Sequence, residues 1–157
     1  MLKNLPRVIE CFDMSNFSYD YTVGAMVQFI DRVENKQGYR RFEIRSLHKK
    51  QDDFMAMREC VYRRYFSLKE KGGDYPDLII IDGGMGQLGV SYEALKSLGV
   101  EHIPIISLAK QEEEIFTPYL NTSIKINKNS EMMKLIRYIR DCVHNYVVCY
   151  NKKKSDL

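Results

Sequence analysis

The stretch that decides the fold is Asp77-Leu-Ile-Ile-Ile-Asp-Gly-Gly-Met-Gly-Gln87. Its aliphatic run, residues 78–81, is bounded by proline and glycine and predicts a strand that is buried on both faces of a sheet. Asp82 stands at the carboxyl end of that strand, and the glycines lead into a segment of helical period that closes at Gly99. Because open α/β sheets place their sites where a strand turns into a helix, Asp82 is the first candidate for chemistry.

Two other interpretations of this stretch stay open. Glycines after a strand can cradle a phosphate, although the spacing here fits neither the nucleotide P-loop nor the dinucleotide fingerprint. Asp82 can also simply cap the turn or helix that follows it.

Composition indicates one ordinary domain with a real core, since 45% of the 157 residues are apolar. The formal charge is only +3, from 24 basic against 21 acidic residues, so any affinity for nucleic acid must come from local clusters. The four cysteines show no metal-ligand spacing, which predicts reduced thiols in a cytosolic protein. No signal peptide or membrane span is visible in the sequence.

The first half of the chain predicts an antiparallel meander. Residues 8–12 read as a short strand that ends in Asp13, and a polar, aromatic loop follows over residues 16–21. Residues 22–30 and 39–44 then read as two further strands, joined by a hairpin turn at residues 35–38.

The second half alternates helices and strands. The acidic pair Asp52-Asp53 precedes a helical apolar stripe, and its default role is a helix cap. Residues 103–108 predict a strand parallel to residues 78–81, because a helix crosses between them. A charged loop over residues 109–114, by default solvated surface, and two short extended pieces lead to a last helix, from Glu131 to about Tyr150.

Two acids thus follow two predicted strands. If those strands are parallel neighbours, Asp13 and Asp82 emerge together at one edge, and hard carboxylate oxygens suit Mg²⁺ or Mn²⁺. His144 lies on the polar face of the last helix with Arg137 and Arg140, and an imidazole ligand would favour Mn²⁺. Taken alone, His144 is more often a partly buried, hydrogen-bonded histidine than a ligand.

Six motifs in order and spacing also resemble one known family: Glu10-Cys11-Phe12-Asp13, residues 39–42, Asp53 with Arg63-Arg64-Tyr65, residues 76–87, residues 108–116 and Arg140-Asp141-Cys142-Val143-His144. They are similar to the C-terminal endonuclease domain of UvrC, the incision subunit of bacterial nucleotide excision repair. The resemblance covers nearly the whole chain.

This resemblance implies an RNase H-like fold of the α/β class, in which a mixed five-stranded sheet, three antiparallel strands followed by parallel ones, has flanking helices and a C-terminal helix. It implies a single domain over residues 1–157, excised from a larger cytoplasmic, bacterial protein, that cuts DNA on the 5′ side of a lesion with a divalent metal. Asp13, Asp82 and His144 would then be the catalytic, metal-binding triad and Asp53 a further acid. Lys110 would neutralise a phosphate oxygen.

The implied partners are damaged double-stranded DNA and UvrB, the latter through a segment outside this chain, and the isolated domain is expected to be monomeric. Basic side chains expected to contact phosphates are Arg40, Arg41, Arg63, Arg64, Lys110, Arg140, Lys152 and Lys153. The chain departs from the family where His-Arg-Phe-Ala is usual and His144-Asn145-Tyr146-Val147 stands, and where a later His-Arg-Lys is replaced by Tyr150-Asn151-Lys152. The alternative function is a catalytically silent module that binds nucleic acid or a repair partner.

Overall fold

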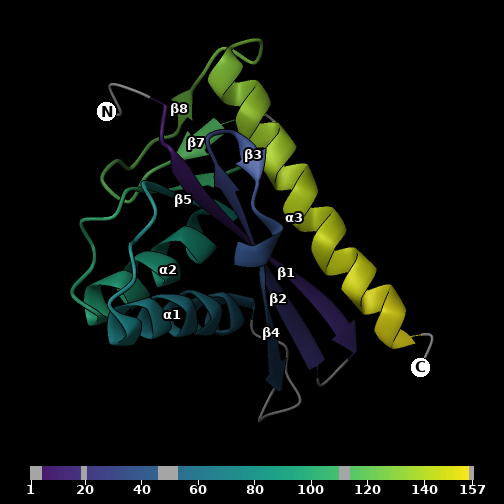
Figure 1. Cartoon of the computed structure of the whole chain (residues 1–157). Helices are drawn as coiled ribbons and strands as arrows, with labels where there is room; N and C mark the ends of the chain where they lie inside the picture. Colours follow the sequence, from purple (N-terminus) through teal and green to yellow (C-terminus); the bar gives the residue numbers. More distant parts are fainter. Residues whose placement is uncertain (1–4, 19–20, 46–52, 110–113, 156–157) are drawn as a thin grey trace.

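The sheet lies between two layers of helices (Figure 1) in the computed structural model, which describes residues 5–18, 21–45, 53–109 and 114–155. The elements, in chain order, are β1 (Val8–Ser18), β2 (Tyr21–Ile30), β3 (Val33–Glu34), a 3-10 helix (Lys36–Gly38), β4 (Arg40–Arg45), α1 (Asp53–Lys71), β5 (Leu78–Asp82), α2 (Met85–Ser97), β6 (Ile105–Leu108), β7 (Glu114–Phe116), β8 (Ile124–Lys125) and α3 (Glu131–Ser155). The strands form one sheet in the order β3-β2-β1-β5-β6-β7-β8, and β4 also pairs with β2.

The predicted mixed α/β fold is confirmed. β1, β2 and β4 pair antiparallel, whereas β5 runs parallel to β1 and β6 runs parallel to β5. The sheet has eight strands and not the expected five, because β3, β7 and β8 are added. These three are two or three residues long, too short to produce a periodic pattern in the sequence. β7 and β8 lie where two short extended pieces, residues 115–118 and 123–126, were expected but not counted as strands of the sheet.

β1 is longer than predicted, which corrects the expectation that Asp13 ends a strand and that a loop begins at Asn16. The strand continues to Ser18 because its antiparallel ladder with β2 continues that far. Only Ile9 to Phe12 are also paired with β5. Asp13 therefore stands inside β1, at the point where the parallel ladder stops.

The turn after β2 was also misplaced. β2 turns into β3 through Asp31 and Arg32, both with positive φ, as two-residue hairpins require. The expected turn at residues 35–38 is instead the 3-10 helix that connects β3 to β4. Neither Asp31 nor Arg32 is glycine, so the usual sequence signal for this turn is missing.

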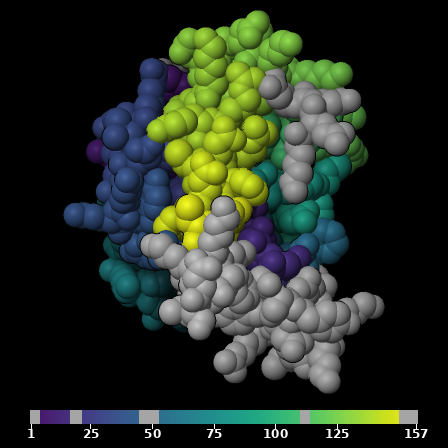
Figure 2. Space-filling view, turned by 90° about the vertical axis from the view of Figure 1, so that its right-hand side faces the viewer, coloured from purple at the N-terminus to yellow at the C-terminus, as the bar shows by residue number. Residues whose placement is uncertain are grey.

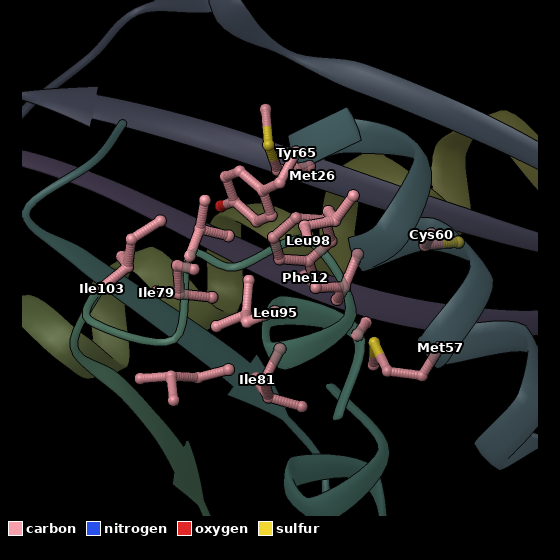
Figure 3. Close-up of a cluster of buried hydrophobic side chains, with 14 of the residues drawn as sticks. Phe12, Met26, Met57, Cys60, Tyr65, Ile79, Ile81, Leu95, Leu98 and Ile103 are labelled. Atoms are coloured by element: carbon pink, nitrogen blue, oxygen red, sulfur yellow. The ribbon is translucent and has the colours of Figure 1, made fainter. Parts of the chain in front are cut away.

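Strand alternation divides the core into two clusters. On one face, Phe12 and Ile81 pack against Met57 and Tyr65 of α1 and Leu95 of α2 (Figure 3). α1 and α2 lie side by side on this face, and α3 crosses the other face diagonally (Figure 1).

The cluster under α3 is built from the alternate strand residues. Cys11 and Ile80 on the sheet meet Ile139 and Val143 of the helix. The period of the last helix predicts an apolar stripe at Met132, Leu135, Ile136, Ile139, Val143 and Tyr146. The structure confirms its centre, Ile136, Ile139 and Val143, which are buried together with Met133 and Val147. α3 lies over β1 and β2, so its side chains are fixed relative to these two strands. No helix in the described part of the chain has the length and apolar character needed to span a bilayer.

Candidate metal site beside β1 and β5

Register places the two candidate acids side by side. The last Cα partners of the parallel β1–β5 ladder are Phe12 and Ile81, and Asp13 and Asp82 come directly after them. Cys11 and Ile80, two residues earlier on each strand, face α3. Because side chains alternate along a strand, both acids also project toward α3, from strands about 4.8 Å apart. The two strands are therefore parallel neighbours, the arrangement under which Asp13 and Asp82 were expected to emerge together.

Asp13 is held in a defined orientation. Its Oδ1 accepts a hydrogen bond from the Met14 backbone N–H at 2.8 Å, and its Oδ2 lies 3.4 Å from Nδ1 of His144. The carboxylate side chain is 11% exposed, whereas the imidazole is 63% exposed. The site thus has a mostly buried carboxylate at its base and a solvent-accessible imidazole at its edge.

The electrostatics of Cys11 show that the acids share one neighbourhood. Burial raises the pKa of the Cys11 thiol, and the negative charges of Asp82 and Asp13 raise this pKa further. Arg140 of α3 acts in the opposite direction and lowers it. A field that opposes a further negative charge is one that favours a cation.

The glycines after Asp82 serve the local fold. The Gln87 side chain folds back to accept a hydrogen bond from the Gly84 backbone N–H at 3.1 Å. A Cβ at Gly83 would lie 3.0 Å from the Gln87 Cβ and one at Gly86 would lie 2.4 Å from the Phe54 ring, so side chains there would displace Gln87 and separate α1 from α2. These contacts favour close packing over a phosphate cradle.

The donor set fits a hard divalent cation in an open site. Among the residues that the structure describes, no three His, Cys, Asp or Glu side chains enclose a metal position. Two adjacent carboxylates nevertheless suit Mg²⁺, which keeps several waters and is usually held by one or two carboxylates together with substrate phosphates. Asp13 and Asp82 are the residues placed to hold such an ion, with His144 in reach of the same space.

Asp53 begins α1, which packs on the opposite face of the sheet, and its side chain is exposed. The contact of Phe54 with Gly86 puts this helix start close to the start of α2, at the end of the sheet where β5 stops. Asp53 therefore lies near the end of the sheet where β5 stops, but in the layer of α1 and α2 and not in the layer of α3, which carries His144. The loop with Lys110 lies outside the described residues, as do the side chains of Lys152 and Lys153.

The prediction that Arg64 contacts DNA is wrong. This residue was expected on a DNA-contacting surface, but its guanidinium is buried and binds Glu10 through Nε at 3.2 Å and Nη2 at 2.7 Å. Glu10 also accepts hydrogen bonds from the Tyr65 hydroxyl at 2.8 Å and from Gln28 Nε2 at 2.7 Å. This network was not predicted from the sequence, although Arg64 lies seven residues after buried Met57 on the helix and thus on its inward face.

Three of the other arginines that were expected to contact phosphates are exposed: Arg40, Arg41 and Arg63. Arg40 donates to the backbone carbonyls of Gln37 and Tyr39, and Arg63 pairs with Glu59 at 3.3 Å. Arg140 is half-buried beside Asp141, at 3.7 Å, on the helix that carries His144.

Comparison with known proteins agrees with this geometry. The family model of the UvrC RNase H endonuclease domain matches residues 1–148. The chain is 45% identical to UvrABC system protein C of Methanococcus maripaludis, over 100% of this chain and 30% of the relative, and 44% identical to that of Cytophaga hutchinsonii, over 98% and 26%. It thus spans less than a third of the length of these relatives.

A solved structure, Ciona intestinalis endonuclease V in complex with DNA containing an inosine, has a TM-score of 0.48 and 15% identity over 88% of this chain and 57% of that one. The family match covers both strands that carry the adjacent acids and the helix that carries His144. The chain therefore belongs to the UvrC RNase H endonuclease domain family.

Proposed function

We propose that this chain hydrolyses DNA phosphodiesters with the help of a divalent metal ion bound at Asp13 and Asp82. The observation that carries this proposal is the placement of the two acids directly after the last paired residues of adjacent parallel strands, with the His144 imidazole 3.4 Å from one of them. The family match adds the endonuclease class. When bound, Mg²⁺ or Mn²⁺ would lower the pKa of a water and stabilise charge on the phosphate.

Each residue has a distinct task in this proposal. Asp13 and Asp82 supply two negative charges. Buried Cys11 and the apolar face of α3 shield the base of the site from solvent. The Met14 N–H holds Oδ1 of Asp13, and Oδ2 lies 3.4 Å from Nδ1 of His144. His144, exposed at the rim, either ligates the ion or transfers a proton between water and the reacting oxygens.

The role in the cell follows from the relatives. They are named UvrABC system protein C, and we infer that the intact protein containing this chain incises damaged double-stranded DNA 5′ to a lesion in the cytoplasm, together with UvrB. Binding to the DNA backbone would come from exposed basic residues, which predicts weak sequence preference and strong salt dependence.

The second candidate function is a catalytically silent module that binds DNA or a repair partner. The departures from the family after His144 change residues expected near the DNA-binding surface, and this is the observation in favour of such a module. They leave Asp13, Asp82 and His144 in place, and so do not argue against catalysis.

A metal titration followed by an incision assay separates the two. Isothermal titration of the chain with Mn²⁺ should show one binding event that Asp13→Asn and Asp82→Asn each abolish. The chain should then replace the corresponding segment of the Methanococcus maripaludis protein in a UvrABC incision reaction on lesion-containing DNA. Incision by the wild-type graft but not by either variant supports the nuclease, and metal-independent incision contradicts it.

A further inference from the structure

The helix that carries His144 is held on one side by β3 and its partner strand. Glu34 on β3 accepts hydrogen bonds from the Tyr138 hydroxyl and, at 3.8 Å, from the thiol of Cys142, one turn further along α3. Phe29, the cross-strand partner of Glu34 on β2, meets the Tyr138 ring edge-on, with centroids 5.8 Å apart at 86°. A carboxylate and an aromatic ring on neighbouring strands thus hold the same tyrosine.

A second contact follows one turn further along the helix. Tyr39, between the 3-10 helix and β4, packs edge-on against the Tyr146 ring, with centroids 5.0 Å apart at 68°. Tyr138, Cys142 and Tyr146 are spaced by four residues, so they form one stripe on a single flank of α3, called the side stripe below. Burial, together with the negative charges of Cys142 and Glu34, raises the pKa of Tyr39 to about 12, so the polar and aromatic contacts share one neighbourhood.

His144 lies on the opposite flank of the same helix. Successive residues are about 100° apart around an α-helix, so His144 points about 160° away from Cys142. Buried Val143 lies between the two flanks and packs on the sheet. On the face that carries α3 (Figure 2), the blue segment that contains β2 to β4 runs along one side of the yellow helix, and purple β1, the strand of Asp13, shows on the other side. The side stripe and the site therefore contact α3 from opposite sides.

The position of the imidazole depends on how α3 is rotated about its own axis. The core under this helix is mainly aliphatic, and the burial of aliphatic groups is non-directional. Side chains reach about 5–6 Å from a helix axis, so a rotation of about 20° moves a side-chain tip by about 2 Å. Such a shift would break the 3.4 Å contact between His144 Nδ1 and Asp13 Oδ2. Hydrogen bonds and edge-on rings have preferred geometries, so the side stripe restricts this rotation.

We propose that Glu34 and Tyr39 are positioning residues of the nuclease, which fix the rotation of α3 through the side stripe and so hold the His144 imidazole beside Asp13. The inference deepens the proposed nuclease function and rests on it. Both residues act through the imidazole, so their loss should lower the rate of the chemical step and leave DNA binding nearly unchanged.

The first test compares disruptive with conservative changes in the UvrABC incision reaction, with the chain grafted into the Methanococcus maripaludis protein. Glu34→Leu removes the acceptor and should lower kcat by about 10- to 100-fold at nearly constant KM, because a misplacement of about 1 Å can cost that much. Glu34→Gln keeps an oxygen that accepts from Tyr138 and should stay close to the wild type. Tyr39→Leu should lose part of the activity, whereas Tyr39→Phe, which keeps the ring, should lose none.

Two controls separate positioning from a general loss of stability. Tyr65→Phe weakens the hydrogen-bond network on the opposite face of the sheet, and it should incise like the wild type at a temperature where it and Glu34→Leu are both folded by circular dichroism. Glu34→Leu combined with His144→Ala should incise as fast as His144→Ala alone, because Glu34 acts only through the imidazole.

NMR of the free chain tests the position of the ring without metal, DNA or cleavage. The chain has three histidines, so selective labelling gives few ring signals, and His144→Ala identifies the relevant one. At about pH 8, where a free imidazole is neutral, Asp13→Ala should shift this signal because it removes the contact. Glu34→Leu should shift the signal in the same direction, and Tyr65→Phe should leave it in place.

An unmoved His144 signal in Glu34→Leu, or a loss of incision that adds to that of His144→Ala, would overturn the inference and leave the nuclease proposal intact. A wild-type graft that does not incise DNA would instead count against the nuclease proposal. The ring signal would then still decide whether Glu34 positions His144, since that measurement needs neither metal nor DNA.

Discussion

The two faces of the sheet each receive one acid from β1, and the protein treats these acids in opposite ways. Glu10 is 1% exposed on the face of α1 and α2, where it accepts hydrogen bonds from Arg64, Tyr65 and Gln28. Asp13, three residues later on the face of α3, has an imidazole at 3.4 Å and an opening to solvent. One acid is therefore enclosed by three protein donors, and the other lies beside an exposed imidazole.

The difference shows how a strand can carry structure and chemistry at once. A buried carboxylate is tolerated only when charged and hydrogen-bonding partners replace its water, and Glu10 has them. Such a group has no oxygen to offer a metal ion. Asp13 instead lies beside the exposed His144 imidazole at the solvent edge of the α3 face, where an ion or a substrate can approach it.

The largest expected effect concerns the open acids. Asp13→Ala and Asp82→Ala should each reduce incision by about 10⁴-fold, because residues that act as a catalytic unit fail together. Thermal unfolding of the same variants should be nearly unchanged, since neither acid anchors the core. Incision is measured on lesion-containing DNA with the chain grafted into a complete relative. If the Asp13 or Asp82 variant lost as much unfolding free energy as Glu10 variants do, the contrast between an open and a closed acid would be wrong.

The closed acid should show the reverse. Glu10→Ala should cost about 3–5 kcal/mol of unfolding free energy, because it leaves the buried Arg64 charge without its partner. Urea denaturation measures this loss. A matched double variant, Glu10→Met with Arg64→Met, removes both charges and should be far closer to the wild type. A single variant as mild as the double one would show that the pair is solvated, contrary to the structure.

A smaller loss is expected from Tyr65→Phe. The change removes only the hydroxyl that donates to Glu10 at 2.8 Å, and a hydrogen bond to a charged group is worth roughly 1.5–3 kcal/mol. The ring stays in place against Phe12. Metal affinity, measured by Mn²⁺ titration, should not change, because this network lies on the far side of the sheet from Asp13. Weaker Mn²⁺ binding would mean that the two faces are coupled through β1.

The smallest effect is expected at a third acid, Glu34 on β3, which accepts hydrogen bonds from Tyr138 and Cys142 of α3. Burial raises the pKa of Cys142, and Glu34 raises it further. Glu34→Gln removes the second cause, so the pKa of Cys142 should fall and more thiolate should exist at pH 8. Iodoacetamide should then label Cys142 a few-fold faster, as mass spectrometry of the modified peptide would show, while labelling of exposed Cys149 should not change.

The central strand, the parallel order and the site acids were within reach of the sequence because each has a strong local signal. Four aliphatic residues before Asp82 allow only a buried strand, and a helix between two strands requires them to run parallel. The stripe of α3 likewise predicted which side of the helix packs on the sheet. Together these elements determine that Asp13, Asp82 and the helix of His144 come together.

Other features depend on tertiary contacts that no local pattern carries. The length of β1 follows from its pairing with β2, and the Asp31-Arg32 turn uses residues without the usual signal. Arg64 was expected on the outer face of its helix with Arg63, although its position seven residues after Met57 lies on the inward face. A glutamate inside a strand buried on both faces was the second hint, since Glu10 needs a cation.

The hydrogen bond from the Met14 N–H to Asp13 Oδ1 has a spectroscopic consequence. It forms just beyond the last β1 residue paired with β5, and it joins a backbone amide to the Asp13 carboxylate. The Met14 amide is therefore a reporter attached to the candidate ligand. Its proton chemical shift and its exchange with deuterium should change when Mg²⁺ draws on the Asp13 carboxylate. In an NMR titration, one backbone signal would thus follow metal binding without any substrate present.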